Sequence, residues 1–525
     1  MFWPTPDTQS DLSRPLLLLP DRMADANVKA VMSWMDFLKA GQTYLNGLYG
    51  YCFDFMSPYW VAARSFNRTE QCKVLQHRPG ETARDYLELL LFNIETNRKA
   101  LLTSFKALNE FHAREAERAF SASLNTILDR EGEDIASYSH RLANLMERLV
   151  YGYPEAIRDI EKDFGFHFND GGYVRVAETD RFYLYKVLPR HKGVEVRPKG
   201  KPVLIIPPYV LGADILGFLP GEDKSYTHCF ANQGIPTYIR IIKDIEVTPA
   251  VQTMTGEDDC LDTRHFCEVI KRRHGRPVTL NGYCQGGFVS ALNLLSGELD
   301  GLVDAFVTCV APMDGTRSRV LTEYLEHIPE RFRDLGYAVK ELPNGNRVVD
   351  GKVMSWVYKL KSMDREAPLF AFYRDLHMFD GSNPGEVRIP ATAAALNYWL
   401  IYERSDLPVG ITKLSFDSYT KPVSKDGTLP VRLFGRELNF KRLKEKNVKW
   451  LICIAEGDDL VDREAALAPL DFVDAEVSVF PKGHGAMATS WSLPTSDCAL
   501  HTCFSGGRGP VRFQLDLEQE TNPAS

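Results

Sequence analysis

Apolar residues follow strand-like patterns over most of the chain after residue 171. Two alternating runs, at 173–177 and 182–187, predict an antiparallel hairpin at the edge of a sheet. The later runs are almost wholly apolar, as is typical of strands buried on both faces of a parallel sheet. These runs lie at 202–208, 235–242, 276–281, 305–310, 448–455 and 475–480. Helical patterns at 225–233, 258–274 and 288–295 separate several of them, and the order predicts an α/β domain.

The first 170 residues lack this pattern and are predicted to form a helical N-terminal region. From 81 to 150, apolar residues recur every three or four positions, which indicates long amphipathic helices. Residues 28–63 are rich in aromatic side chains and contain three glycines. Two interpretations of this stretch stay open: a helical hairpin packed on the main domain, or an amphipathic surface that touches a lipid or polymer phase.

A short motif between the 276–281 strand and the helix that follows carries the first candidate chemistry. Gly282-Tyr283-Cys284-Gln285-Gly286 lies at a sharp turn between the predicted strand and the predicted helix. This is the pattern of a nucleophile elbow with cysteine as the nucleophile. The glycines allow strand and helix to pass close together. The positive end of the helix would lower the pKa of the Cys284 thiol, so the motif predicts a reactive cysteine.

An acid and a base follow the last two predicted strands. Asp458 comes directly after the 448–455 strand, and His484 comes directly after the 475–480 strand. The order nucleophile, acid, base, each at the carboxyl end of a strand, is that of α/β-hydrolases. We therefore predict a triad of Cys284, Asp458 and His484, with Asp459 as the alternative acid if the register differs by one residue.

Two backbone positions are candidates for an oxyanion hole. The amide of Gln285 follows the nucleophile and would supply one donor. The second donor is expected from the loop after the 202–208 strand, where Pro208 has no N–H but Tyr209 or Val210 could donate.

The predicted architecture is thus an α/β-hydrolase fold preceded by an all-α region. We place the helical region at 1–170, the catalytic domain at 171–495 and a flexible tail at 496–525. An aromatic, irregular insertion at about 316–443 separates two core strands and is interpreted as a cap over the active site. Its aromatic residues are expected to form an apolar lid over the cysteine. They are Trp356, Phe370, Phe372, Tyr373, Phe379, Tyr398 and Trp399.

Composition limits the classes of binding partner and the cellular compartment that we expect for this chain. The 525-residue chain has a net charge of -8, which argues against a general nucleic-acid binder. Its 10 cysteines include no Cys-x-x-Cys pair and no zinc-like spacing, which fits a reduced cytoplasmic compartment. No run approaches the length of a membrane span, and no signal-peptide pattern opens the chain. We expect a cytoplasmic protein with no metal, no cofactor, no nucleic-acid partner and no transmembrane span.

The box at 282–287, with its Pro-rich loop upstream and the Asp458 and Gly-His484 motifs downstream, resembles the polyhydroxyalkanoate synthases over about residues 170–490. The resemblance implies an acyltransferase that acts on (R)-3-hydroxyacyl-CoA thioesters. Cys284 would take the acyl group, His484 would deprotonate the thiol and the incoming hydroxyl, and Asp458 would orient the histidine. The partners that follow are an acyl-CoA substrate, a polyester granule surface and a second copy of the chain in a homodimer.

Two other functions stay open. A cysteine hydrolase, either a thioesterase or an intracellular polyester depolymerase, would use the same three residues with water as the acceptor. A binding or scaffold protein could use the helical region to coat granules, but it would have no reason to keep nucleophile, acid and base in order. The insertion departs from the family's Trp-Asn-x-Asp and Tyr-x-x-Asn-x-Leu stretches, so the residues support acyl transfer more strongly than polymerisation.

Overall fold

The computed structural model describes residues 19–76, 78–319, 322, 336–354, 366–380 and 389–490. The chain clusters into two compact units. The first holds 19–60, 93–159 and the described residues of Ser362–Ala394, and the second holds the rest. Each unit is built from several separate stretches of the chain, so these units do not correspond to a single boundary in the sequence. The division of the chain at residue 170 therefore stays a prediction. The predicted tail at 496–525 and Trp356 of the predicted lid lie outside the described residues.

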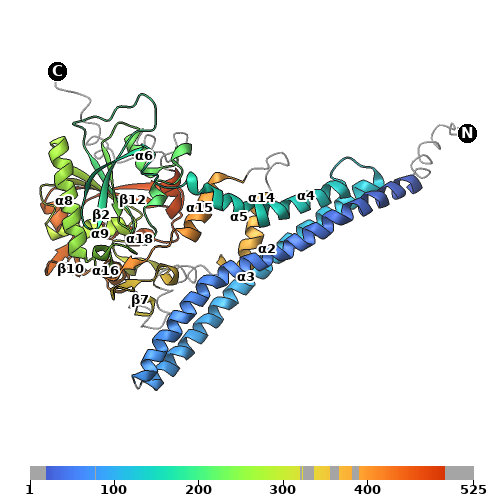
Figure 1. Ribbon diagram of the computed structural model, residues 1–525, viewed down its shortest axis with the longest axis horizontal. Helices are drawn as coiled ribbons and strands as arrows, with labels where there is room; N and C mark the ends of the chain where they lie inside the picture. The colour runs from blue at the N-terminus through green and yellow to red at the C-terminus, as the bar shows by residue number, and fades with distance from the viewer. Residues whose placement is uncertain are drawn as a thin grey trace, which may run out of the picture. The chain divides into compact units, whose positions relative to one another are not determined.

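An eight-stranded sheet forms the centre of the second unit (Figure 1). Its order is β1-β2-β4-β3-β5-β6-β12-β13, and β2 runs antiparallel to its neighbours while the others are parallel. The bounds are β1 Tyr173–Glu178, β2 Phe182–Val187, β3 Val203–Ile206, β4 Thr237–Ile242, β5 Val278–Tyr283, β6 Val303–Cys309, β12 Lys449–Ala455 and β13 Glu476–Phe480. Each strand overlaps a predicted run. With the nucleophile turn directly after β5, this is the α/β-hydrolase fold.

The central strands are apolar because both faces of the sheet are covered. Every residue of β3 and of β5 is buried, including Asn281, whose side chain exchanges hydrogen bonds with the hydroxyl of Tyr226. Parallel strands covered on both faces carry continuous apolar runs, and this explains why the sequence pattern located them well. Nearer the edges of the sheet the strands are partly exposed: burial alternates over the first half of β2 and along β13.

Helices lie between these strands, and one follows the last of them. They are α6 Tyr226–Ala231, α7 Pro249–Gln252, α8 Gly256–His274, α9 Gln285–Ser296, α17 Lys441–Glu445, α18 Arg463–Leu467 and α19 His484–Ser490. The longest, α8, has a capping box in which Thr255 and Asp258 satisfy each other's backbone amides, and it ends at Gly275 with φ 71°. These two signals explain why its bounds lie close to the predicted 258–274.

The insertion between β6 and β12 contains helices and two small sheets. β7 Val339–Glu341, β8 Arg347–Val349 and β9 Leu407–Pro408 form one sheet, and β10 Thr428–Leu433 and β11 Arg436–Asn439 form the other. Its described long helices are α14 Pro368–Asp380, α15 Ala391–Tyr402 and α16 Val409–Thr420. Of these, α16 lies wholly within the second unit and contacts α8 and α9.

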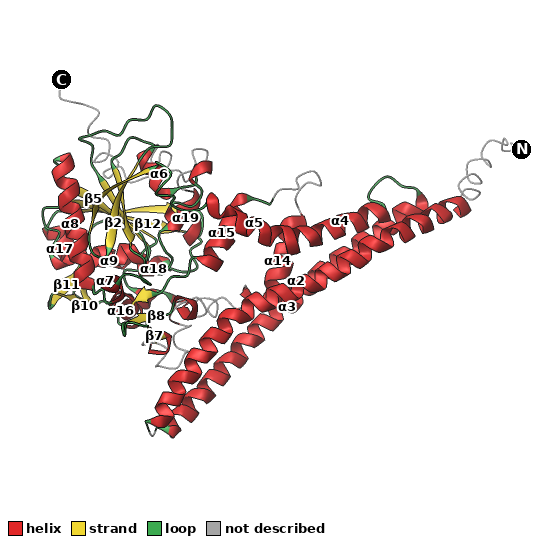
Figure 2. Cartoon of the chain, in the orientation of Figure 1, coloured by secondary structure: helices red, strands yellow, loops and turns green. Residues whose placement is uncertain are grey.

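Two long helices, α2 Leu19–Leu75 and α3 Pro79–Leu128, run side by side as an antiparallel pair (Figure 2). They are followed by α4 Ile135–Glu147 and α5 Tyr153–Asp159, with a single π-helical turn, Arg148–Gly152, between them. The prediction of a hairpin within residues 28–63 is wrong, because this stretch is one uninterrupted part of α2. The three glycines do not break the helix, since the hairpin turn lies after Leu75. Among the described helices, none is long and apolar enough to cross a membrane.

The helix α14 packs within the first unit, and this corrects the predicted aromatic lid. Phe372 is buried with its ring edge against Tyr44 and Tyr51, at centroid distances of 5.6 and 5.2 Å. Tyr373 is hydrogen-bonded through its hydroxyl to that of Tyr44, and Phe379 packs on Tyr153. Phe372, Tyr373 and Phe379 therefore belong to a helical core and do not form a lid.

We predict that Gly47 is required by this core. A β-carbon on Gly47 would lie 2.6 Å from both Phe372 and Val150, whereas one on Gly41 of the same helix would meet nothing within 4 Å. Gly47→Leu should therefore destabilise the protein by about 1–3 kcal/mol through overpacking. Gly41→Leu should stabilise it by about 0.5–1 kcal/mol through helix propensity. Urea unfolding followed by circular dichroism measures both, and equal midpoints for the two variants would contradict the packing described.

Candidate active site

Cys284 lies on a strained turn between β5 and α9. Its backbone has φ 51° and ψ -124°, a conformation that costs an L-residue about 1–3 kcal/mol. Close contacts hold the turn on both sides: a β-carbon on Gly282 would lie 2.4 Å from Cα of Gly287, and one on Gly286 would lie 2.3 Å from the carbonyl oxygen of Ile206. The Cys284 amide donates to the carbonyl of Cys309 at 2.8 Å. The geometry is that of the predicted elbow, and it explains the need for glycine at both positions.

The structure brings Asp458 and His484 together. Nδ1 of His484 lies 2.9 Å from Oδ2 of Asp458, and both side chains are nearly inaccessible, at 7% and 3% exposed. The other carboxylate oxygen, Oδ1, accepts the amides of Leu460 and Val461 at 2.9 Å each. These three contacts fix the orientation of the carboxylate. The alternative acid, Asp459, is exposed on the same loop.

The environment of the other ring nitrogen of His484, Nε2, includes the candidate nucleophile Cys284. Nε2 is buried, and no described group is placed in full hydrogen-bond geometry with it. Burial alone would lower the pKa of His484, but the neighbouring Cys284 and Asp458 outweigh burial and raise this pKa to about 10. Cys284 is thus a neighbour of the imidazole, although Nε2 has no hydrogen-bond partner within the described residues. Catalytic contacts of this kind often tighten only when substrate binds.

Tyr283 is a further residue of the site, and the sequence analysis did not identify its role. Its hydroxyl donates to the carbonyl of His484 at 2.6 Å, and its ring stands edge-on to the imidazole at 6.0 Å and 84°. The residue before Cys284 therefore holds the backbone of His484. The position of a tyrosine next to Cys284 is visible in the sequence, but its partner lies 201 residues away.

The predicted oxyanion donors are occupied by a side chain. The amides of Tyr209 and Val210 both donate to Oε1 of Gln285, at 3.1 and 3.0 Å. The Gln285 side chain is buried, and its Nε2 donates to Oγ of Ser415 in α16 at 2.7 Å. The role of Tyr209 or Val210 as a donor to an oxyanion stays a prediction, and it requires the Gln285 side chain to move. The amide of Gln285 itself opens α9, where the first N–H groups have no partner within the helix.

The side chain of Tyr209 anchors the loop after β3 through a group of buried polar residues. Its hydroxyl donates to Oδ2 of Asp259 and accepts from Nη2 of Arg240 at 3.1 Å. Arg240 and Asp259 are fully buried and form an ion pair at 2.7 Å. Asn293 donates to the other oxygen of Asp259 at 2.7 Å. Burial raises the pKa of Tyr209 well above its usual value, so the phenol stays neutral and keeps its proton for Asp259.

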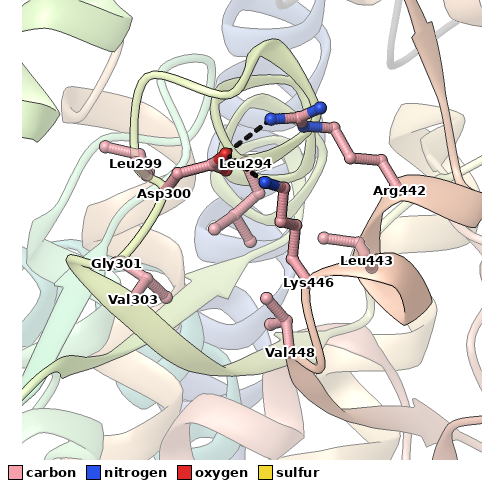
Figure 3. A pocket seen from close by; sticks show the side chains of 9 residues that line it. All are labelled: Leu294, Leu299, Asp300, Gly301, Val303, Arg442, Leu443, Lys446 and Val448. Carbon is pink, nitrogen blue, oxygen red and sulfur yellow. Dashed lines mark hydrogen bonds and ion pairs between the residues drawn. The ribbon is translucent and has the colours of Figure 1, made fainter.

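A small pocket elsewhere in the second unit is not part of this site (Figure 3). It has a volume of about 120 Å³ and lies at the amino ends of β6 and β12, whereas Cys284 follows the carboxyl end of β5. Asp300 in its wall is paired with Arg442 and Lys446, at 2.6 and 3.0 Å. Ligand pockets commonly exceed about 300 Å³, so this one is too small for an acyl-CoA. Within the described part of the chain, no cluster of His, Cys, Asp and Glu is placed to hold a metal ion.

Neither the family models nor the curated proteins compared with this sequence give a match. Among solved structures, the chain is similar to a soluble variant of monoglyceride lipase from Saccharomyces cerevisiae, with 11% identity, a TM-score of 0.39, and coverage of 68% of this chain and 99% of the lipase. A carboxylesterase from Nitrososphaera gargenis has 13% identity, a TM-score of 0.35, and coverage of 60% and 92%. An esterase from Rhodococcus sp. ECU1013 has 15% identity, a TM-score of 0.33, and coverage of 66% and 98%. The assignment of the fold rests on the strand order and the elbow described above.

We predict that His484 stays protonated through neutral pH. Its pKa in the folded protein lies above the ordinary value of 6.5, so the stabilisation from its charged form is complete below pH 6.5 and is lost as the pH rises toward 10. In Asp458→Asn and in Cys284→Ala, one of the two groups that raise the pKa of His484 is changed, and burial should pull this pKa down. A nitrogen-15 NMR titration of the imidazole measures all three proteins. A wild-type midpoint at or below 6.5 would refute the charge arrangement.

Proposed function

We propose that the chain is a cysteine-dependent acyltransferase that polymerises (R)-3-hydroxyacyl groups from CoA thioesters. One observation carries the proposal: a buried histidine is hydrogen-bonded to Asp458 and neighbours a cysteine on a strained strand-to-helix turn, and this cysteine helps to raise the pKa of the histidine. A thiolate paired with an imidazolium is an activated nucleophile at neutral pH. The resemblance of the 282–287 box to polyhydroxyalkanoate synthases supports the choice of substrate.

In the first half of the reaction, Cys284 would take the acyl group. Its sulfur attacks the thioester carbonyl, and the carbonyl oxygen becomes an oxyanion. The carbon–sulfur bond to CoA then breaks, and the leaving thiolate takes the proton from His484. The product is an acyl thioester on Cys284 beside a neutral imidazole. This exchange of one thioester for another keeps the acyl group activated for the next step.

In the second half, His484 would act as the base. The neutral imidazole takes the proton of a 3-hydroxyl group at the end of another acyl chain. The resulting oxygen nucleophile attacks the acyl group on Cys284, the new carbon–oxygen bond forms, and the bond to sulfur breaks. The thiolate and imidazolium are restored. Asp458 holds the ring with Nδ1 toward itself throughout, and its charge stabilises the imidazolium.

The identity of the acceptor separates this proposal from a cysteine hydrolase. Purified protein should release CoA from 3-hydroxybutyryl-CoA and convert the acyl group into an ester-linked polymer, which gel-permeation chromatography detects. Free 3-hydroxybutyrate as the main product would assign a thioesterase or depolymerase instead. Cys284→Ala should abolish CoA release, whereas Cys72→Ala, which changes an exposed cysteine, should not. Equal rates for these two variants would exclude Cys284 as the nucleophile.

A matched pair of substitutions tests the acid. Asp458→Asn should lower turnover by about a thousandfold or more, because the histidine loses its orienting charge. Asp459→Asn alters the exposed neighbour and should leave turnover near the wild-type rate. Circular dichroism checks that both variants fold, and CoA release measures the rate. The opposite ranking of the two variants would assign the role to Asp459.

A further inference from the structure

We infer that the side chain of Gln285 is a plug in the oxyanion hole, and that the cap helix α16 controls it. This inference rests on the proposed function. Oε1 of Gln285 accepts both amides of the loop after β3, those of Tyr209 and Val210, while Nε2 donates to Ser415. One side chain thus connects the oxyanion donors to the insertion, and it does so beside the nucleophile.

The plug competes directly with the reaction. Each backbone N–H has one proton to donate, and a developing oxyanion needs donors at hydrogen-bond distance. While Gln285 Oε1 accepts from the amides of Tyr209 and Val210, this neutral oxygen stands where a substrate oxyanion would have to bind. A substrate oxyanion can use these donors only after the Gln285 side chain rotates away. The plugged state therefore stabilises a resting enzyme and not a transition state.

The alternative is that Gln285 is a brace that positions the loop, but other contacts already do this. The Tyr209 hydroxyl is held by the buried pair of Asp259 and Arg240. The carbonyls of Ile206 and Pro207 press on Gly286 so closely that a β-carbon there would lie 2.3 and 2.6 Å from them. Trp399 also donates to the carbonyl of Leu211 at 2.8 Å. With the loop fixed on these sides, its amides stay in place when Gln285 leaves.

The contact with Ser415 makes the plug responsive to substrate. Ser415 lies in α16, within the insertion that is predicted to cover the site. An acyl group that enters beneath α16 and displaces it would break the bond from Gln285 Nε2 to Ser415 Oγ. The freed side chain could then turn and release the two amides. Acyl binding and completion of the oxyanion hole would thus occur together, and the site would be inactive when empty.

Two substitutions of Gln285 distinguish the plug from a brace by their order. Gln285→Glu keeps the length and the acceptor oxygens, and a carboxylate binds amide donors more strongly than an amide does, so the plug reading predicts at least about a tenfold loss of turnover. Gln285→Ala removes the plug and should be at least as fast as wild type. The probe is 3-hydroxybutyryl-CoA, with CoA release as the readout. If Gln285→Glu is faster than Gln285→Ala, the side chain is a brace and the inference is wrong.

A second pair of variants leaves Gln285 unchanged. Ser415→Ala removes only the contact that holds the plug, and it should raise turnover at low substrate by about two- to tenfold, the effect of one neutral hydrogen bond. Ser418→Ala is the matched control, because Ser418 lies one turn on and bonds the carbonyl of Ser415 within the same helix. Equal or lower turnover in Ser415→Ala than in Ser418→Ala would overturn the inference even if the Gln285 variants do not fold.

Failure of the inference can be told apart from failure of the proposed function. If Cys284→Ala releases CoA as fast as wild type, the proposed nucleophile is wrong, and the plug has no reaction to control. If CoA release depends on Cys284 but Gln285→Glu is faster than Gln285→Ala, the proposed function stands and the plug is excluded. Alkylation of Cys284 by iodoacetamide needs no oxyanion hole, so its rate in Ser415→Ala, which introduces no charge, should stay within about twofold of wild type.

Discussion

The strained backbone at Cys284 is the constraint on which the site depends. A residue at φ 51° and ψ -124° persists only where its surroundings hold it, and here β5 and α9 pass so close that no side chain fits at Gly282 or Gly286. The strain lifts the thiol to the carboxyl edge of the sheet and places it at the positive end of a buried helix. The proposed pairing of Cys284 with His484 and Asp458 depends on this turn.

The buried charges around the turn are arranged in two separate groups. Asp458 and His484 lie on one side, and the ion pair of Arg240 and Asp259 lies under the loop after β3 on the other. Breaking a buried pair by removal of one partner costs about 3–5 kcal/mol, so each group is a rigid support. Gln285 differs from both, because it is neutral and bonds to a helix of the insertion. The hydrogen bonds of the Gln285 side chain are therefore the ones that we expect to change during a reaction.

The sequence located the strands of the sheet, and the places of Cys284, Asp458 and His484 at strand ends, because both depend on local signals. Each of Cys284, Asp458 and His484 follows directly after a strand that its apolar run reveals, and parallel strands end at one edge. The sequence left Asp458 and Asp459 as alternatives, and in the structure it is Asp458 that lies 2.9 Å from Nδ1 of His484. The same local reasoning placed the capped helix α8 to within two residues of its observed start.

What the sequence did not show depends on contacts between distant residues. The hydroxyl of Tyr209 finds Asp259 50 residues away, and Gln285 finds Ser415 130 residues away. No periodicity encodes such pairs. The aromatic residues of α14 are predicted to form a lid for the same reason: the sequence of an aromatic helix does not show which distant residues the helix packs against. The uninterrupted α2 shows that tertiary and pairwise packing can override the weak preference of glycine against helix.

The covalent intermediate is the central claim, and mass spectrometry of the intact protein tests it most directly. After brief mixing with 3-hydroxybutyryl-CoA and acid quenching, the account predicts a protein that has gained one or more hydroxybutyryl groups, with the first of them on the peptide that contains Cys284. Cys284→Ala should gain none. Release of CoA without any acylated protein, or acylation of a different residue, would contradict the account.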